Sequence, residues 1–240
     1  MTLGPNYGFF ARIGVLIPSG NITAEPQLHT LLPPGVSIHT TRLKLTGSSP
    51  RQLLSMIENV EEAALLLADL RPDLIVFHCT AVSTWNPEMD AAICQRIENV
   101  TGIKAITTAS ALINAFRTLH VQRTVLVSPY TDAINQREVA FLEHYGIHTS
   151  KVVGLGIDHP VDMHTVEPSV WESLVLENQC SDAQAYFVSC TAVRSLEVIQ
   201  SLEDSIGIPV LTSNQVMLWH ALRSVRVTLP IPGYGKLLRI

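Results

Sequence analysis

Short apolar stretches of strand length alternate with amphipathic stretches along the whole chain. Most of the apolar stretches are continuous and rich in β-branched residues, which is typical of strands that are covered on both faces. We predict strands at residues 12–18, 36–43, 73–78, 104–108, 123–129, 151–157, 185–189 and 209–213. Strands of this kind belong in parallel sheets that lie between layers of helices.

The amphipathic stretches predict helices between these strands. The clearest pattern covers 50–70, where apolar residues recur at steps of three and four. Another begins with Asn86 and Pro87, a favourable N-cap followed by proline at the first helical position, and extends to Val100. Further helices are predicted at 109–119, 132–145, 168–178, 192–205 and 214–225. The alternation of strand and helix predicts an α/β fold of mostly parallel sheets flanked by helices.

An internal repeat runs through the chain at an offset of 111 positions. The tetrapeptide CTAV begins at Cys79 and again at Cys190, and RIGVLIPS from Arg12 resembles RTVLVSPY from Arg123. Each cysteine is followed by a predicted helix, a glycine and a strand that ends in hydroxyl residues. The repeat therefore predicts two similar α/β halves.

These halves define the expected domain organisation. We predict two pseudo-symmetric lobes, 1–115 and 116–225, packed without a flexible linker and with the active site in the cleft between them. The tail 226–240 contains proline and glycine residues that exclude a regular helix, and we expect it to cross back onto the first lobe.

The composition narrows the possible partners. The net charge is −5 and only 15% of the residues are charged, with no cluster of Lys and Arg, so neither nucleic acid nor an anionic membrane is expected as a partner. No run of eighteen apolar residues occurs, and the N-terminal residues lack the basic start of a signal peptide. We therefore expect a cytoplasmic protein without a transmembrane helix.

Metal and cofactor motifs are absent from the sequence. None of the four cysteines forms a CxxC pair, and the nine histidines show no HxH or HExxH spacing. No P-loop or complete dinucleotide fingerprint is present. We expect a site that uses neither a metal nor a cofactor.

The two CTAV cysteines are the strongest candidates for chemistry. Cys79 and Cys190 each follow a predicted strand, where the N–H groups of the next turn favour a thiolate, an oxyanion or a substrate carboxylate. The residues Thr80 and Thr191 add a hydroxyl and an N–H to the same places. Packing alone does not require this context twice, so we assign chemistry to these two cysteines and ordinary packing to Cys94 and Cys180.

Polar residues at other strand ends complete the candidate site. The turn PSGNIT after the first strand contains Ser19 and Asn21, and its matched segment SPYTD contains Tyr130. Asn21 and Tyr130 can each donate a hydrogen bond to a carboxylate. His78 is poorly placed as a base for Cys79, because adjacent strand residues point to opposite faces. The predicted substrate-binding residues are Ser19, Asn21, Thr80, Ala81, Tyr130 and Thr191.

The segments IPSGNITAEP, HCTAVS, SPYTDAINQREVAFLEHYGI and VSCTAVRSLEVI together resemble the aspartate/glutamate racemase superfamily, in its branch of maleate cis–trans isomerases and arylmalonate decarboxylases. The resemblance extends from Arg12 to about Arg239. It implies a cofactor-free site between two pseudo-symmetric lobes, with Asn21 and Tyr130 as binding residues. Maleate isomerases carry both cysteines, whereas arylmalonate decarboxylases keep only the second and have glycine in place of Cys79.

One segment departs from the maleate isomerase pattern. In IDHPVDMH, Pro160 occupies the place of a further substrate-binding asparagine, and proline has no side-chain donor. His159 is the neighbouring side chain that can take over this contact. This departure does not affect the two-cysteine chemistry. It removes one expected side-chain contact to a dicarboxylate such as maleate.

The preferred hypothesis is a cofactor-independent isomerase of a small carboxylate or dicarboxylate. The resemblance implies Cys79 as nucleophile and Cys190 as acid–base partner, since the sequence alone treats the two alike. Racemisation of an amino acid or a 2-aryl acid, and decarboxylation of a malonate, remain as alternatives on the same fold. A non-enzymatic small-molecule sensor is a third hypothesis, and a homo-oligomer is compatible with each.

Overall fold

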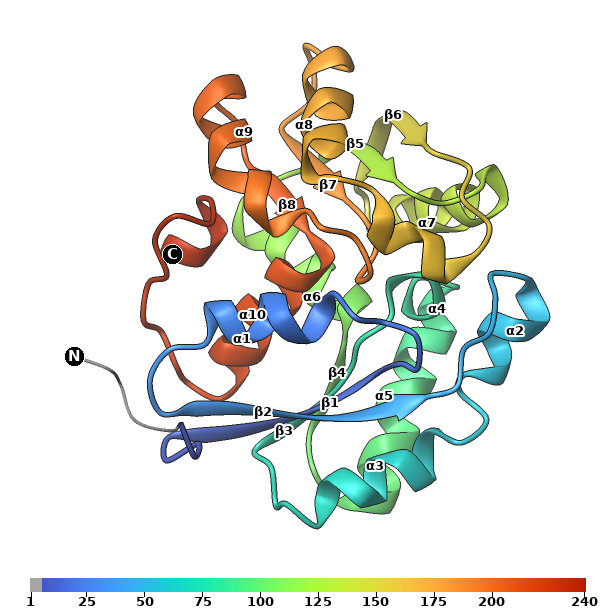
Figure 1. Cartoon of the computed structure of the whole chain (residues 1–240), viewed down its shortest axis with the longest axis vertical. Helices are drawn as coiled ribbons and strands as arrows, with labels where there is room; N and C mark the ends of the chain where they lie inside the picture. Colours follow the sequence, from blue (N-terminus) through green and yellow to red (C-terminus); the bar gives the residue numbers. More distant parts are fainter. Residues whose placement is uncertain (1–5) are drawn as a thin grey trace.

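The computed structural model describes residues 6–240, and its strands form two four-stranded parallel sheets. The sheets have the orders β2-β1-β3-β4 and β6-β5-β7-β8, and Figure 1 shows one in each half of the molecule. The first contains β1 (Ala11–Pro18), β2 (Val36–Leu43), β3 (Leu74–Phe77) and β4 (Ala105–Thr107). The second contains β5 (Arg123–Ser128), β6 (His148–Gly154), β7 (Ala185–Val188) and β8 (Val210–Thr212). The predicted fold class is confirmed.

Helices follow the strands in both halves. The first half contains α1 (Ala24–Leu31), α2 (Pro50–Ser55), α3 (Val60–Ala68), α4 (Thr80–Ser83), α5 (Pro87–Thr101) and α6 (Thr108–Thr118). The second contains α7 (Asp132–His144), α8 (Pro168–Glu177), α9 (Ile199–Ile206) and α10 (Ser213–Ser224), with short 3-10 segments η1 (Pro160–Thr165), η2 (Leu196–Val198) and η3 (Leu237–Arg239). Among residues 6–240, no helix combines the length and hydropathy that a membrane span requires.

Three local predictions differ from the structure. The helix predicted over 50–70 is divided into α2 and α3, because the residues between them form tighter turns and Asn59 leaves the helical conformation to begin α3. Strand β6 begins three residues before the predicted start at 151. It is an edge strand whose exposed residues lack a continuous apolar signal. Helix α1, which contains Pro26, was not predicted.

A fourth difference lies directly after Cys190. The helix predicted over 192–205 begins only at Ile199, after the 3-10 segment η2. The backbone carbonyls of Thr191, Ala192 and Val193 accept hydrogen bonds from side chains elsewhere in the fold. These tertiary contacts hold the segment in a loop, so the same CTAV sequence that forms α4 in the first half is not helical here.

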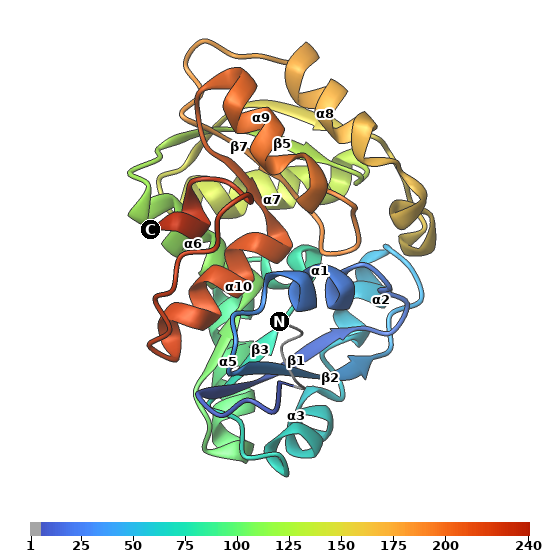
Figure 2. The same ribbon diagram turned by 60° about the vertical axis from the view of Figure 1, so that its left-hand side comes forward.

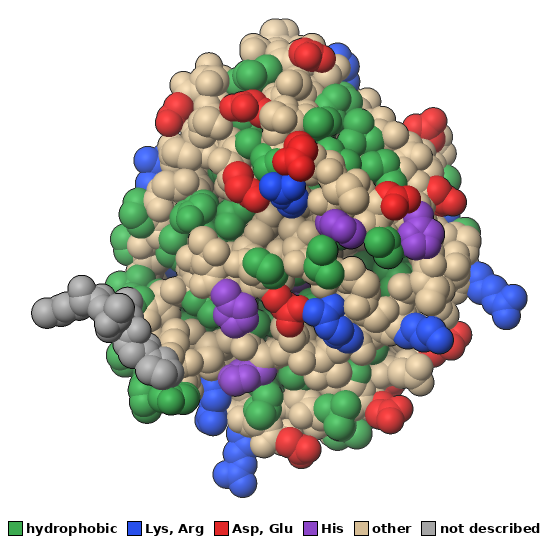
Figure 3. All heavy atoms as spheres, viewed as in Figure 1, with side chains coloured by type: hydrophobic (Ala, Val, Ile, Leu, Met, Phe, Trp, Pro, Cys, Tyr) green, Lys and Arg blue, Asp and Glu red, His purple; other side chains and the backbone are tan. Residues whose placement is uncertain are grey.

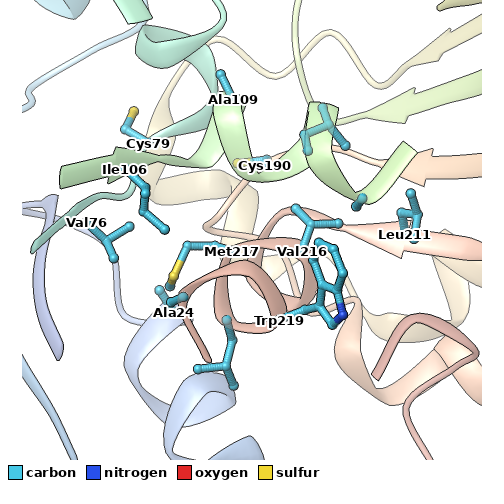
Figure 4. Close-up of a cluster of buried hydrophobic side chains, with 14 of the residues drawn as sticks. Ala24, Val76, Cys79, Ile106, Ala109, Cys190, Leu211, Val216, Met217 and Trp219 are labelled. Carbon is cyan, nitrogen blue, oxygen red and sulfur yellow. The ribbon is translucent and has the colours of Figure 1, made fainter. Parts of the chain in front are cut away.

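The last helix of each repeat packs against the other half. Helix α6 follows β4, yet Phe116 on α6 lies edge-on to Phe187 of β7, with ring centroids 6.3 Å apart. Helix α10 follows β8, yet it contacts α1 and β3 of the first half. Figure 4 shows Met217 of α10 pointing towards Ala24 of α1. Helices α6 and α10 also pack on each other between the two sheets, as Figure 2 shows.

The tail 226–240 lies against α9 and α10. The backbone N–H groups of Gly235 and Lys236 donate to Gln200 and Glu203 of α9, and Gln215 of α10 donates to the carbonyl of Tyr234. These hydrogen bonds join the tail to helices of the second half. Helix α10, and not the tail, is the segment near this end of the chain that contacts β3 of the first sheet.

A buried histidine connects the two halves. His78 is fully buried, with Nδ1 2.9 Å from Thr108 Oγ1 and Nε2 2.8 Å from Asn214 Oδ1. Burial lowers the pKa of His78 to about 4, although the hydrogen bond to Asn214 opposes this shift. The folded protein therefore keeps a neutral imidazole at this junction.

This imidazole makes stability depend on pH. Because the folded-state pKa lies below the unfolded value of 6.5, the unfolded chain binds one more proton between pH 6.5 and about 4. Stability is present above pH 6.5 and is lost as the pH falls through this window, by about 1.4 kcal/mol per pH unit. We expect His78→Gln to flatten this slope in urea unfolding at pH 7 and pH 5, relative to the parent chain. Equal slopes in the two proteins would contradict the prediction.

Candidate active site

A cavity of about 310 Å³ lies where the two halves meet. Its lining includes six of the eight predicted site residues: Asn21, Cys79 and Ala81 from the first half, and Tyr130, Cys190 and Thr191 from the second. The face of the molecule in Figure 3 carries Lys and Arg scattered among Asp and Glu, without a basic cluster. No Lys or Arg lines the cavity, so positive potential for an anionic ligand must come from hydrogen-bond donors of the lining.

The other two predicted residues lie outside this lining. Ser19 Oγ accepts a hydrogen bond from the N–H of Leu45 at 3.1 Å, so Ser19 holds a cavity-lining loop. Thr80 is buried and donates through Oγ1 to Ser213 Oγ at 2.8 Å. Both side chains support residues that contact the cavity.

Cys79 lies between β3 and α4 in ordinary extended backbone, with φ −151° and ψ 109°. Burial raises the pKa of its thiol to about 12, and the N–H of Val82 opposes this shift, as does that of Ala81. The thiol form therefore predominates at neutral pH. When Cys79 ionises, the amide N–H groups at the start of α4 stabilise the negative charge on its sulfur.

Cys190 has a different backbone. Its φ of 102° lies in the region that favours glycine, and its N–H donates to Ser213 Oγ at 3.0 Å. Burial raises the pKa of the Cys190 thiol to about 11, against hydrogen bonds from the Tyr130 hydroxyl and the Ala192 N–H. A residue in a sparsely populated backbone region persists only where the surrounding contacts hold it, and such residues cluster at functional sites.

Ser213 connects the two cysteine loops. Its Oγ accepts from Thr80, the residue after Cys79, and from the backbone N–H of Cys190. Since Thr80 and Cys190 come from different halves, one hydroxyl fixes their relative positions.

Tyr130 completes the inner wall of the cavity. Only 4% of its surface is exposed, and burial raises its pKa well above the usual value, so the phenol stays protonated as a hydrogen-bond donor. Its backbone is held by Ser128, which accepts from the Tyr130 N–H, and by Asn135, which donates to the carbonyl.

Asn21 joins the first turn to the second cysteine loop. Its Oδ1 accepts from the N–H groups of Thr23 and Ala24, both at 2.9 Å, at the start of α1. Its Nδ2 donates to Thr191 Oγ1 at 3.0 Å. One amide hydrogen of Asn21 remains for a ligand.

These contacts predict separable effects at Asn21. Asn21→Ala removes both functions of the amide and should lower the free energy of unfolding by about 1–3 kcal/mol. Asn21→Asp keeps the oxygen acceptor at the start of α1, where its negative charge is favourable, and the Thr191 hydroxyl can donate to the carboxylate in place of the lost donor, so its loss should be smaller. Guanidinium unfolding of both variants measures the difference. Equal losses would show that the helix-capping oxygen contributes nothing.

Sequence reasoning missed most of the remaining lining. This part of the cavity is mainly apolar and consists of Pro18, Gly20, Leu45, Thr46, Ser48, Leu53, Ile134, His159, Pro160, Val161, Met163 and Ala192. Met163 is 2% exposed and its Sδ lies 3.7 Å from Cys190 Sγ. The sequence signal that could have identified the lining residues of this segment is the alternation of apolar and polar residues in IDHPVDMH. His159 caps η1 by accepting from the Val161 N–H.

Within the described part of the chain, no group of three or more His, Cys, Asp or Glu side chains is placed to hold a metal ion. The polar side chains that line the cavity offer two thiols, a phenol, an amide, an imidazole and three hydroxyls. This set is suited to nucleophilic and proton-transfer chemistry at a small ligand.

Comparison with known proteins gives consistent relatives. A maleate isomerase from Nocardia farcinica is 30% identical over 95% of both chains. A solved structure of the maleate cis–trans isomerase from the same organism, a cysteine-to-serine mutant with a covalently bound succinylcysteine intermediate, superposes with a TM-score of 0.89 at 27% identity, covering 95% of this chain and 98% of that one. An arylmalonate decarboxylase from Bordetella bronchiseptica is 26% identical, over 94% of this chain and 95% of its own.

The family model for arylmalonate decarboxylase matches residues 13–238, nearly the whole chain. The resemblance predicted from the strand-end motifs is thereby confirmed. The chain belongs to the arylmalonate decarboxylase family and is an enzyme.

Proposed function

We propose that this enzyme catalyses the cis–trans isomerisation of maleate or a closely similar small cis-dicarboxylate. The observation that carries the proposal is that the thiols of Cys79 and Cys190 line one cavity from opposite halves. The maleate isomerase relatives support the same reaction class. A cysteine at both positions also matches the isomerase side of the family resemblance rather than the decarboxylase side.

Cys79 acts as the nucleophile. As the substrate binds, Cys79 gives its proton to solvent, and the thiolate is held by the N–H groups of Ala81 and Val82. The sulfur attacks one olefinic carbon, a C–S bond forms, and the π electron pair moves to the neighbouring carbon and its carboxylate. The covalently bound succinylcysteine in the Nocardia structure is an adduct of this kind in that protein.

Cys190 acts as the acid and then as the base. Its thiol donates a proton to the neighbouring carbon, which gives a succinyl thioether on Cys79. The former double bond is now single and rotates. The Cys190 thiolate then removes the proton, the double bond re-forms in the trans geometry, and the C–S electron pair returns to Cys79. The reaction involves no net oxidation.

Polar side chains of the lining bind the two carboxylates. Tyr130 and Asn21 are side-chain donors at the cavity wall, and Thr191, whose hydroxyl accepts from Asn21, lines the same cavity. Donors aimed at the carboxylate that receives the π electrons stabilise its developing enediolate.

Decarboxylation of an aryl-substituted malonate is the second candidate. It is favoured by the apolar part of the lining, where Leu45, Ile134 and Met163 offer contacts to an apolar substituent. In that reaction the C–CO2 bond breaks, CO2 leaves, and Cys190 donates a proton to the resulting carbanion.

Proton NMR in D2O separates the two functions. We expect the purified enzyme to convert the vinyl signal of maleate to that of fumarate, while phenylmalonate is unchanged. Loss of CO2 from phenylmalonate with deuterium at the α-carbon, and no change in maleate, would favour the decarboxylase. The Cys79→Ala variant is the matched control: the proposed isomerisation needs Cys79 and should be lost, whereas loss of CO2 that survived the substitution would indicate a Cys190-dependent decarboxylase.

A further inference from the structure

A fully buried carboxyl group lies directly behind Cys190. Glu138 is on α7, it has no exposed surface, and its partner is Ser189, the residue before Cys190. Ser189 Oγ lies 2.8 Å from one carboxyl oxygen of Glu138 and 2.9 Å from the other. The reaction steps above use neither residue.

The geometry of this pair fits a neutral carboxylic acid. The Ser189 hydroxyl has one proton and donates it to one oxygen of Glu138. A protonated carboxyl group can donate back to Ser189 Oγ from its second oxygen, so both short contacts become hydrogen bonds. Burial raises the pKa of Glu138 to about 8, and the Ser189 hydrogen bond opposes this shift. An ionised carboxylate in this place would be buried without a cationic partner.

The charge of Glu138 acts on the active site. A negative charge on Glu138 raises the pKa of Cys190 and of Tyr130. Arg137, its neighbour on α7, stacks over Trp85, with its guanidinium carbon 4.1 Å from the ring centroid. Ionisation of Glu138 therefore opposes formation of the Cys190 thiolate.

The internal repeat supplies a comparison within the same chain. At the repeat offset, Gln27 corresponds to Glu138 and His78 corresponds to Ser189. Gln27 and His78 are joined through Asn214, at 2.6 Å and 2.8 Å, and the imidazole is neutral. The group behind Cys79 thus carries no charge at neutral pH, whereas the group behind Cys190 can ionise.

We propose that Glu138 is a positioning residue for Cys190: through Ser189 it holds the end of β7, and the charge of its carboxyl group controls how readily Cys190 forms a thiolate. At neutral pH Glu138 is in its neutral acid form and does not oppose ionisation of Cys190. At higher pH, once Glu138 has ionised, its buried carboxylate suppresses the Cys190 thiolate. The inference rests on the proposed function only in taking Cys190 as the acid–base group.

The test measures the Cys190 thiol itself, so it does not depend on any substrate. In a Cys79→Ser background, the rate of iodoacetamide alkylation at Cys190 is followed by peptide mass spectrometry from pH 6 to pH 10. We expect Glu138→Gln to match the background protein at pH 6.5 and to react about tenfold faster at pH 9.5, which corresponds to one pKa unit. Parallel rates at every pH would overturn the proposal.

Two further variants separate this effect from a loss of structure. Ser189→Ala removes the donor that lowers the pKa of Glu138, so the break in the rate profile should move to higher pH; an unchanged break would overturn the proposal even if Glu138→Gln failed to fold. Glu203→Gln is the matched control, because Glu203 is also buried in the second half but accepts from the N–H groups of Val210 and Lys236. Its profile should follow that of the background protein, and the same alkaline gain there would show that the effect is not specific to Glu138.

Discussion

Replacing Cys79 by alanine should lower the rate of maleate isomerisation by about 10⁴-fold or more. The substitution removes the sulfur that forms the covalent adduct, and without the adduct the double bond cannot rotate. In the proposed mechanism Cys190 transfers protons and does not replace the missing nucleophile, so the covalent route is lost. Conversion of maleate to fumarate, followed by ultraviolet absorbance or NMR, measures the loss.

Controls distinguish this loss from a general effect of thiol removal. Cys94 is on α5 and Cys180 follows α8, and neither lines the cavity. Cys94→Ala and Cys180→Ala should therefore keep nearly full activity. If Cys79→Ala retained activity comparable to theirs, the repeated CTAV motif would be a structural strand-end feature without a nucleophile.

Replacing Cys190 by alanine should lower the rate by about 10²–10⁴-fold, the usual cost of losing a general acid–base group. Cys79 can still attack in this variant, and solvent can slowly protonate the adduct carbon. Return to the double bond then lacks its base, so the adduct should accumulate. Intact-protein mass spectrometry should show one added succinyl mass, and peptide mapping should place it on Cys79.

The reciprocal experiment tests the assignment of roles. Cys79→Ala incubated with maleate should show no adduct, because Cys190 is proposed to transfer protons only. An adduct on Cys190 in that variant, with none on Cys79 in the Cys190→Ala protein, would reverse the two roles.

Much of the fold was predictable because the signals are local. Apolar stretches, most of them continuous, identified all eight strands, although the bounds of β6 were shifted, and the CTAV repeat placed Cys79 and Cys190 at corresponding strand ends. Since the carboxyl ends of strands in open α/β sheets form the binding crevice, the repeat also predicted that the two cysteines would share one site. Their common cavity agrees with that expectation.

The lining of the site was less predictable. Asn21 and Tyr130 were found because they follow strands in polar turns, but Met163 and Ile134 reach the cavity from η1 and α7. An apolar residue in a helix has the same local pattern whether it faces a core or a ligand. Only its position relative to the other half decides which.

The amino-acid sequence by itself determined the alternation of strands with most of the helices, because local apolar patterns specify each element, and its repeat at an offset of 111 positions placed Cys79 and Cys190 at corresponding strand ends. The tertiary structure decided that α6 and α10 pack against the opposite halves and that one CTAV segment is helical while the other is a loop. It also placed Cys190 at φ 102° and buried Glu138 behind it. These features depend on hydrogen bonds and packing between segments far apart in sequence, such as Asn21 with Thr191 and Thr80 with Ser213, and such long-range contacts override local propensity.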